Sequence, residues 1–242
     1  GENTIVEEFS DKQDEMVSGT VEMEDVRNYY INLGRTQGIL PKTEIIPGEK
    51  LVMGSTIKVY VSKLEIGSKG LFILLSRSHY GFVKRLLENE IPELSDGTVV
   101  LYSVARDAGN RSKVAVYSEN PNVDPIGACI GERGTRIANI LKELNGEKID
   151  VIEWNADPSI FIAAALLPAQ VMAVDVKEEE KFAQVIVPDD QLSLAIGKSG
   201  QNARLAAKLT NWKIDIKSET QFREIIAKMN EESEEIANVG QK

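Results

Sequence analysis

The pattern of apolar and polar residues in the first third of the chain predicts β-strands. Between Val17 and Ser76, short stretches alternate between apolar and polar residues, and glycines separate several of them. The expected strands cover residues 17–23, 26–33, 37–41, 56–62 and 71–76. Five short strands in this length are typical of a small closed barrel, most often the OB-fold. We therefore expect an OB-fold barrel over residues 16–78.

The spacing of apolar residues then becomes helical. Val83, Leu86 and Leu87 form one stripe, and Ile91-Pro92 ends it. This pattern predicts a connecting helix over residues 79–91.

An internal repeat occupies the second half of the chain. Ile-Gly-x-x-Gly occurs at 130–134 and again at 196–200, each time followed by an amphipathic helix, Lys-Ile-Asp and a strand. A strand also precedes each copy, and an apolar helix from Pro158 opens the second unit. The repeat predicts two similar modules, over 92–157 and 158–226, and hence a multidomain α+β protein.

The Gly-x-x-Gly segments are the candidate functional sites. A helix N-terminus presents unpaired N–H groups and a positive dipole end, and glycine lets a nucleic-acid backbone come close. One such motif can be a simple tight turn, but two copies with the same downstream pattern favour KH modules that clamp single-stranded RNA. The candidate RNA-binding residues are Gly131, Glu132, Arg133, Gly134, Arg136, Gly197, Lys198, Ser199, Gly200, Gln201, Asn202 and Arg204. Glu132 should weaken phosphate contact at the first loop by repulsion.

The charge distribution bears on this interpretation. A formal net charge of −10 by itself argues against nucleic acid. However, residues 1–25 hold nine acids and a single base, and residues 219–242 hold six acids and three bases. Between residues 197 and 217, five bases stand against one acid. The acidity is therefore concentrated at the two ends, and the second motif is locally basic.

Composition excludes several other functions. With one cysteine (Cys129) and one histidine (His79), the chain cannot form an internal disulfide or a zinc site of the usual ligands. No nucleophile-elbow pattern surrounds His79, and no catalytic constellation or cofactor motif is evident. Asp189-Asp190 is interpreted as a loop or a helix cap rather than a metal site. No apolar run is long enough to span a membrane and no signal peptide is visible, so we expect a cytoplasmic protein without metal, cofactor or membrane contact.

The predicted barrel offers weaker candidates for RNA contact. Tyr29 and Tyr30 lie on opposite faces of their strand, so at most one can stack on a base. The candidates chosen from ring or charge alone are Tyr30, Lys42, Lys58 and Arg77.

The sequence resembles the NusA family of bacterial transcription elongation factors. The resemblance rests on the order of barrel, helix and two KH modules, and covers about residues 16–218. Its motifs are Gln37-Gly-Ile-Leu-Pro, Ala105-Arg-Asp-Ala-Gly-Asn-Arg-Ser-Lys-Val-Ala-Val, Val123-Asp-Pro-Ile-Gly-Ala-Cys-Ile-Gly-Glu-Arg-Gly-Thr-Arg and Ala195-Ile-Gly-Lys-Ser-Gly-Gln-Asn-Ala-Arg-Leu-Ala. It implies that the barrel is an S-one-type OB-fold. It also implies type II KH folds, each with two helices, a three-stranded sheet and a further helix.

The same resemblance implies a function and a set of partners. Members of this family bind nascent RNA at RNA polymerase and affect pausing, termination and antitermination, with other Nus factors and Rho as further partners. The family's N-terminal polymerase-binding domain is missing here, so residues 1–15 are expected to be a frayed acidic linker to it. Residues 227–242 are expected to be an acidic tail.

Two alternatives remain open from the residues alone. The chain could be a KH/OB RNA-binding subunit associated with an RNA-processing exoribonuclease, although such proteins place the KH module before the barrel. It could also be a protein-binding adaptor that docks through its acidic ends.

Overall fold

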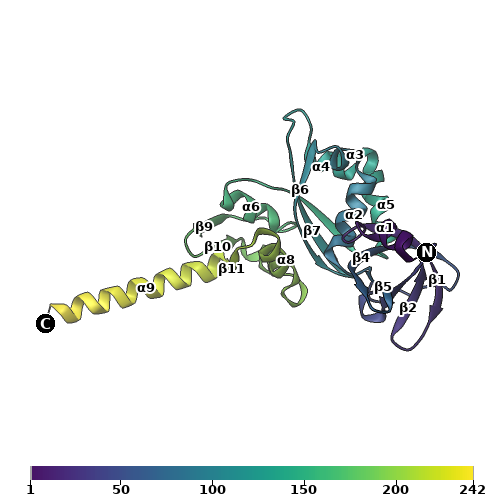
Figure 1. Cartoon of the computed structure of the whole chain (residues 1–242). Helices are drawn as coiled ribbons and strands as arrows, with labels where there is room; N and C mark the ends of the chain where they lie inside the picture. The colour runs from purple at the N-terminus through teal and green to yellow at the C-terminus, as the bar shows by residue number, and fades with distance from the viewer. Residues whose placement is uncertain (1, 242) are drawn as a thin grey trace. The chain divides into compact units, whose positions relative to one another are not determined.

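The computed structural model describes residues 2–241, and the chain forms two compact units (Figure 1). The first unit comprises the chain up to residue 112 together with residues 116–151. The second comprises residues 113–115 and the chain from residue 152 onward.

The expected five-stranded barrel is confirmed. Strands β1 (Met16–Glu24), β2 (Asn28–Asn32), β3 (Gln37–Pro41), β4 (Thr56–Gly67) and β5 (Gly70–Ser76) close in the order β1-β2-β3-β5-β4. The alternation along each strand sends one set of side chains inward, where Ile31, Leu40 and Leu75 are fully buried. Tyr29 is also buried, so Tyr30 is the ring of this pair that faces outward.

The N-terminal segment differs from the expected frayed linker. Residues Glu2–Phe9 form helix α1, and Phe9 belongs to the buried barrel core with Ile5 packed against the same cluster. Beyond the helix, the Asp14 N–H donates to the Val61 carbonyl at 2.8 Å. Ile5 and Phe9 are four residues apart, so they share one helix face, and their burial outweighs the surrounding acidic sequence. Gly1 lies outside the described residues.

The first KH module begins with the predicted connecting helix. Helices α2 (Tyr80–Glu90) and α3 (Pro92–Ser95) precede strands β6 (Val99–Asp107) and β7 (Arg111–Ser118), helices α4 (Pro125–Ile130) and α5 (Thr135–Glu143), and strand β8 (Lys148–Glu153). The sheet order is β6-β7-β8. The apolar stripe of α2 is buried as its spacing predicts, and His79 caps the helix by accepting the Gly81 N–H on Nδ1 at 2.9 Å.

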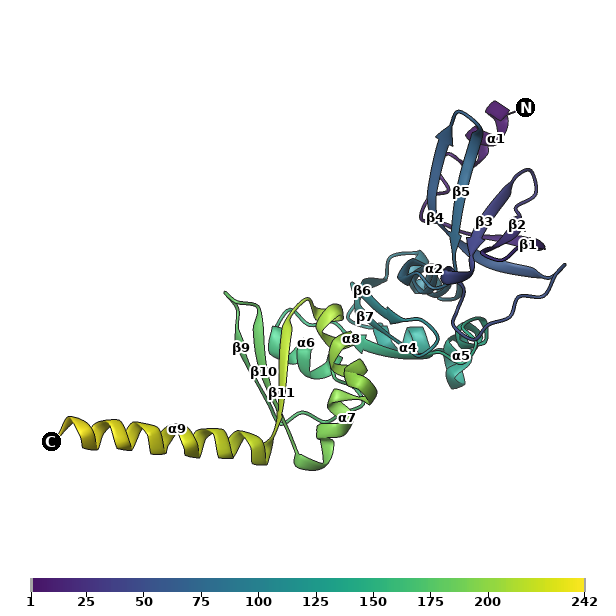
Figure 2. The same ribbon diagram turned by 90° about the horizontal axis from the view of Figure 1, so that it is seen from below.

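The second KH module repeats this order (Figure 2). Helix α6 (Pro158–Ala165) precedes β9 (Ala173–Lys177), β10 (Phe182–Val187), α7 (Leu192–Ile196), α8 (Gln201–Thr210) and β11 (Lys213–Ser218). The sheet order is β11-β10-β9, with β10 parallel to β11 and antiparallel to β9. Both modules thus have the helix, strand and helix–helix order expected of type II KH folds.

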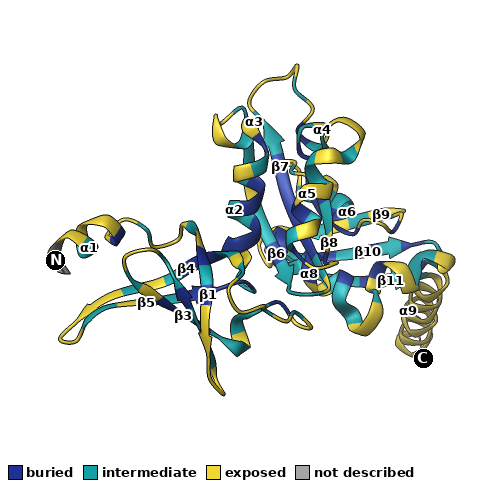
Figure 3. Ribbon diagram, turned by 90° about the vertical axis from the view of Figure 1, so that its right-hand side faces the viewer, coloured by how far each residue is buried: buried dark blue, intermediate teal, exposed yellow. Residues whose placement is uncertain are grey.

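The C-terminal segment, which includes the expected acidic tail, forms a helix. Helix α9 spans Glu219–Gly240, and a capping box between Ser218 and Gln221 begins it. No proline and no glycine before Gly240 interrupts the helix-forming residues. None of the helix's described residues is buried (Figure 3), and Lys242 lies outside the described residues.

Buried charges join the barrel to the first KH module within the first unit. The Arg77 guanidinium, 4% exposed, bonds Glu49 at 2.6 Å and Glu143 at 3.1 Å. Arg106 pairs with the fully buried Glu147 at 2.9 Å and donates to the Arg77 carbonyl at 2.8 Å. Arg77 was a candidate RNA contact because of its charge, but its guanidinium is buried and paired with Glu49 and Glu143.

Candidate nucleic-acid interface

The two Gly-x-x-Gly loops have the same backbone conformation. Each loop lies between two helices, α4 and α5 in the first module and α7 and α8 in the second. The φ and ψ angles are 79° and 170° at Gly131 and 77° and 170° at Gly197. The third loop residues, Arg133 and Ser199, have φ of 56° and 55°, in the left-handed region. The repeat in sequence therefore corresponds to a repeat in three dimensions.

The first glycine of each loop is required by packing. A Cβ on Gly131 would lie 2.6 Å from Cγ of Arg136, and a Cβ on Gly197 would lie 2.8 Å from the backbone nitrogen of Asn202. Any side chain there would displace the start of the following helix.

The residue five positions after the first glycine secures the loop in both modules. Arg136 donates to the Ala128 carbonyl at 2.7 Å. Asn202 occupies the corresponding position and donates to the Ala195 carbonyl at 3.0 Å and to the Leu166 carbonyl at 3.1 Å. Both residues were candidate RNA contacts. Asn202 is only 5% exposed, and Arg136 is paired with Glu93 at 2.7 Å, so the structure gives both a supporting role.

The second glycine of each loop leaves its surface open. A Cβ on Gly134 would meet nothing within 4 Å, and a Cβ on Gly200 would meet only a guanidinium nitrogen of Arg204 at 3.6 Å. Behind these glycines, α5 and α8 begin without a side-chain cap. In contrast, Asp124 and Asp157 cap α4 and α6. The Thr135 and Gln201 N–H groups bond the Glu132 and Lys198 carbonyls within each loop, and no side chain caps the helix starts beyond them. A helix start without a side-chain cap can offer N–H groups to an external acceptor such as phosphate.

The charges around the two loops differ. In the first loop, Glu132 and Arg133 are both exposed, and Arg136 is already neutralised by Glu93. In the second loop, Lys198 is exposed and no acid lies within the motif. Arg204 is exposed as well, and its guanidinium donates to the Ser199 carbonyl at 3.1 Å. The second loop is therefore the more favourable site for an anion.

An apolar surface adjoins the second loop. Leu194 and Ile196 on α7 are 44% and 36% exposed, immediately before Gly197. Apolar surface next to a phosphate clamp suits nucleotide bases. The sequence analysis did not select these side chains as candidates. The isoleucine that precedes each Gly-x-x-Gly motif could have indicated an apolar surface beside the loop. Ser199 lies within the loop, and Gln201 is the first residue of α8.

The barrel candidates are mostly engaged within the protein. The Tyr30 hydroxyl donates to Asp25 at 2.6 Å, which lowers the pKa of that carboxyl. Lys42 pairs with Glu24 at 2.6 Å, and this pairing raises the pKa of the lysine. Lys58 is partly exposed, but its carbonyl accepts from Arg77. Their partners, Asp25, Glu24 and Arg77, all lie outside the first glycine loop.

The polar groups of interest for chemistry have structural roles. Burial raises the pKa of the Cys129 thiol to about 11, which keeps it in the unreactive protonated form. Asp189 accepts hydrogen bonds from the backbone and hydroxyl of Thr220 at the start of α9. Among residues 2–241, no group of three or more His, Cys, Asp or Glu side chains could hold a metal ion. In the same range, none of the helices combines the length and apolarity needed to cross a bilayer.

A barrel followed by two KH modules with open glycine loops defines a class of protein that contacts nucleic acid. Comparison with known families agrees with this arrangement. Residues 77–154 match the model of the NusA-like first KH domain, and residues 158–224 match that of the NusA-like second KH domain. The chain therefore belongs to the NusA family.

Curated relatives carry the same family name. The chain is 53% identical over 221 residues to the transcription termination/antitermination protein NusA of Halalkalibacterium halodurans, with 91% of this chain and 58% of the relative covered. The values for the NusA of Bacillus subtilis are 53%, 91% and 60%. For the NusA of Thermus thermophilus they are 48%, 88% and 55%. The chain thus spans little more than half the length of these relatives.

Proposed function

We propose that this chain binds nascent single-stranded RNA through its two KH loops and acts, without catalysis of its own, in transcription pausing, termination and antitermination. The observation that carries the proposal is the repeated loop, in which an open glycine stands before an uncapped helix. The resemblance of the sequence and the names of its relatives support the transcriptional setting.

The proposed partners follow from the same reasoning. RNA polymerase, engaged mainly through a region outside this chain, would bring the KH modules to the emerging transcript. Other Nus factors and Rho are further partners in this proposal. The alternative of an exoribonuclease-associated subunit predicts RNA turnover in a larger assembly, and incubation with labelled RNA, phosphate and Mg²⁺ distinguishes it: release of nucleotides would favour the alternative.

The decisive experiment uses the second glycine of each loop, because a side chain there meets open space. The double variant Gly134→Asp with Gly200→Asp places a negative charge at the proposed phosphate position. The matched control, Gly134→Asn with Gly200→Asn, requires the same left-handed backbone at each site but adds no charge. Both pairs should retain the native circular dichroism spectrum.

The measurement is the affinity for a labelled single-stranded RNA, followed by fluorescence anisotropy. We expect the aspartate pair to bind at least about tenfold more weakly than the asparagine pair, because charge repulsion replaces phosphate binding. Affinity of the unmodified chain should also fall steeply with salt. Equal binding by the two double variants would refute phosphate clamping at these loops.

A further inference from the structure

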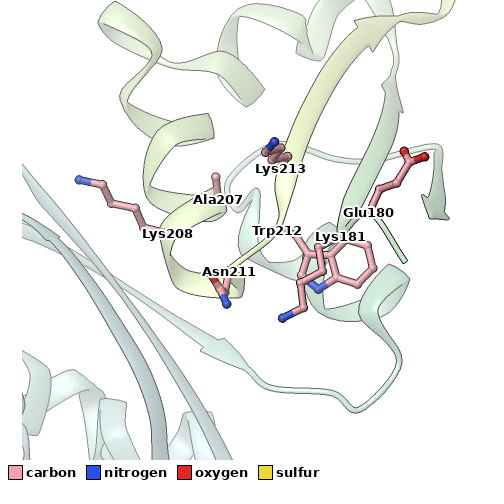
Figure 4. A pocket seen from close by; sticks show the side chains of 7 residues that line it. All are labelled: Glu180, Lys181, Ala207, Lys208, Asn211, Trp212 and Lys213. Carbon is pink, nitrogen blue, oxygen red and sulfur yellow. The ribbon is translucent and has the colours of Figure 1, made fainter. Parts of the chain in front are cut away.

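A basic pocket lies at the end of α8 away from the glycine loop of the second KH module. Its volume is about 360 Å³, and its lining includes Lys181, Lys208, Lys213 and the indole of Trp212 (Figure 4). Glu180 is the single acidic residue in this lining. The pocket thus combines a planar apolar surface with an excess of positive charge.

Backbone interactions place these groups together. Lys181 is the last residue of the turn between β9 and β10 and has a left-handed φ of 48°, and its carbonyl accepts the Lys213 N–H at 2.9 Å. The Trp212 N–H bonds the Ala207 carbonyl at 3.3 Å as α8 ends. The two lysines and the indole are therefore brought together by the fold of the module.

The lysine side chains of the pocket are not neutralised by ion pairs among the described residues. The side chains of Lys181, Lys208 and Lys213 are exposed, and among the residues that the structure describes none of the three forms an ion pair. Trp212 is partly exposed. Lysines that face solvent around an aromatic ring suit a ligand with a phosphate and a stacking base.

A basic track connects this pocket to the glycine loop. Arg204 and Lys208 are four residues apart on α8, so they lie on one face of the helix between Gly200 and the pocket. Helix α8 has 10 residues and is therefore about 15 Å long. In Figure 4 the Lys208 side chain points away from the indole, so Lys208 lines the pocket at its α8 edge rather than beside the ring.

The first KH module shows that the fold does not require tryptophan at this turn. There the corresponding turn reads Asn145-Gly146-Glu147, and Glu147 is buried against Arg106. Asn145 and Asn211 both have left-handed φ values, of 54° and 61°, so the turns begin alike. At this turn the second copy of the repeat has a tryptophan and the first copy has none.

We propose that the Trp212 pocket is a second subsite for single-stranded RNA, in which a base stacks on the indole and its phosphates lie at Lys181 and Lys213. The RNA strand that occupies the second glycine loop reaches the Trp212 pocket along Arg204 and Lys208. This subsite rests on the proposed function, since it extends the RNA path of the same module.

The test compares RNA lengths in the full chain. The probes are labelled oligoadenylates of about four nucleotides, the length that one KH loop clamps, and of about ten nucleotides. The double variant Lys181→Gln with Lys213→Gln removes the pocket charges. The control variant Lys177→Gln with Lys228→Gln removes the same charge from two exposed lysines of the same unit outside the pocket.

We expect the pocket variant to lose about three- to tenfold in affinity for the longer RNA and little for the shorter one. The control should bind both probes almost as the unmodified chain does. In a Trp154→Phe background, which leaves Trp212 as the single tryptophan, the longer RNA should quench the fluorescence more than the shorter one.

Equal losses in the pocket and control variants would overturn the subsite, as would unchanged Trp212 fluorescence with the longer RNA. If the longer RNA leaves the pocket free, so that a glutamate-rich peptide can still bind there, the subsite is also overturned, in favour of a protein ligand. The proposed function is tested separately, because binding of the shorter RNA depends on the glycine loop.

Discussion

Replacement of Glu147 by glutamine tests the most deeply buried charge in the first unit. Glu147 is fully buried and accepts from Nε and Nη2 of Arg106, from the Gly109 N–H and from the Ser112 hydroxyl. The Arg106 side chain is 1% exposed. Burial lowers the pKa of Arg106 from its ordinary value, and the charge of Glu147 opposes this shift. Glutamine keeps the shape but leaves the guanidinium without its counterion.

The expected cost is about 3–5 kcal/mol, the range for the removal of one partner from a buried ion pair. The Arg35–Glu8 pair supplies a matched control, since its side chains are 51% and 42% exposed at 3.3 Å. For Glu8→Gln we expect less than about 1 kcal/mol. The difference between the two substitutions isolates the effect of burial on the same chemical change.

Hydrogen exchange of backbone amides provides the assay, because the chain has two units and a single unfolding transition is not assured. The free energy of opening should fall for amides of β8 and of the junction at residues 77–79, whose Arg77 and His79 carbonyls accept from Arg106 at 2.8 Å. Amides of α8 in the second unit should change little. A cost for Glu147→Gln no greater than that for Glu8→Gln would refute this account of the junction.

Three further predictions concern charge and protonation. Glu132→Lys should raise RNA affinity about three- to tenfold at low salt, because it replaces repulsion of phosphate by attraction, and unchanged affinity in an anisotropy titration would contradict this. Burial lowers the pKa of His79, whose neutral Nδ1 caps α2 through Gly81. Its contribution to stability should therefore be fully present above the unfolded pKa of about 6.5 and be lost as pH falls toward the folded pKa. The free energies of opening of α2 amides from pH 7.5 to 5, measured by hydrogen exchange and compared with those of His79→Asn, check this, and parallel profiles would contradict it. Cys129 should react with a thiol reagent much more slowly in the native chain than in urea, since it is buried with a pKa raised to about 11, and equal rates would contradict its burial.

The barrel and the repeat were predictable because each leaves a periodic signal. Alternation in the strands reports which side chains face the core, as in Tyr29 and Ile31. The KH modules were predictable because two copies of a loop restrict the interpretation more than one does. The left-handed φ values at Gly131 and Gly197 agree with the choice of glycine at those positions.

Side-chain partners were not predictable to the same degree. Arg77, Arg136 and Asn202 were selected for charge or for position beside the motif, and all three bond groups inside the protein. Their partners lie far away in sequence: Glu49 is 28 residues from Arg77, for example. Helix α1 was missed for a related reason. Ile5 and Phe9 stabilise it by packing against a barrel core that is formed by later residues.

The two KH modules show how one backbone can serve different purposes. The loops agree in conformation although Glu132 and Arg133 stand where the second copy has Lys198 and Ser199, so the glycines and the supporting residues determine the shape. The residues between the glycines are then free to vary in charge.

The same division holds at the turn after the second helix of each module. In the first module, Glu147 turns inward, and its pairing with Arg106 ties the module to the barrel through the Arg77 carbonyl. In the second module, Trp212 lies beside exposed lysines instead. A residue buried in an ion pair cannot also meet a ligand. The first module is therefore attached to the barrel at this turn, and the second carries the more basic surface there.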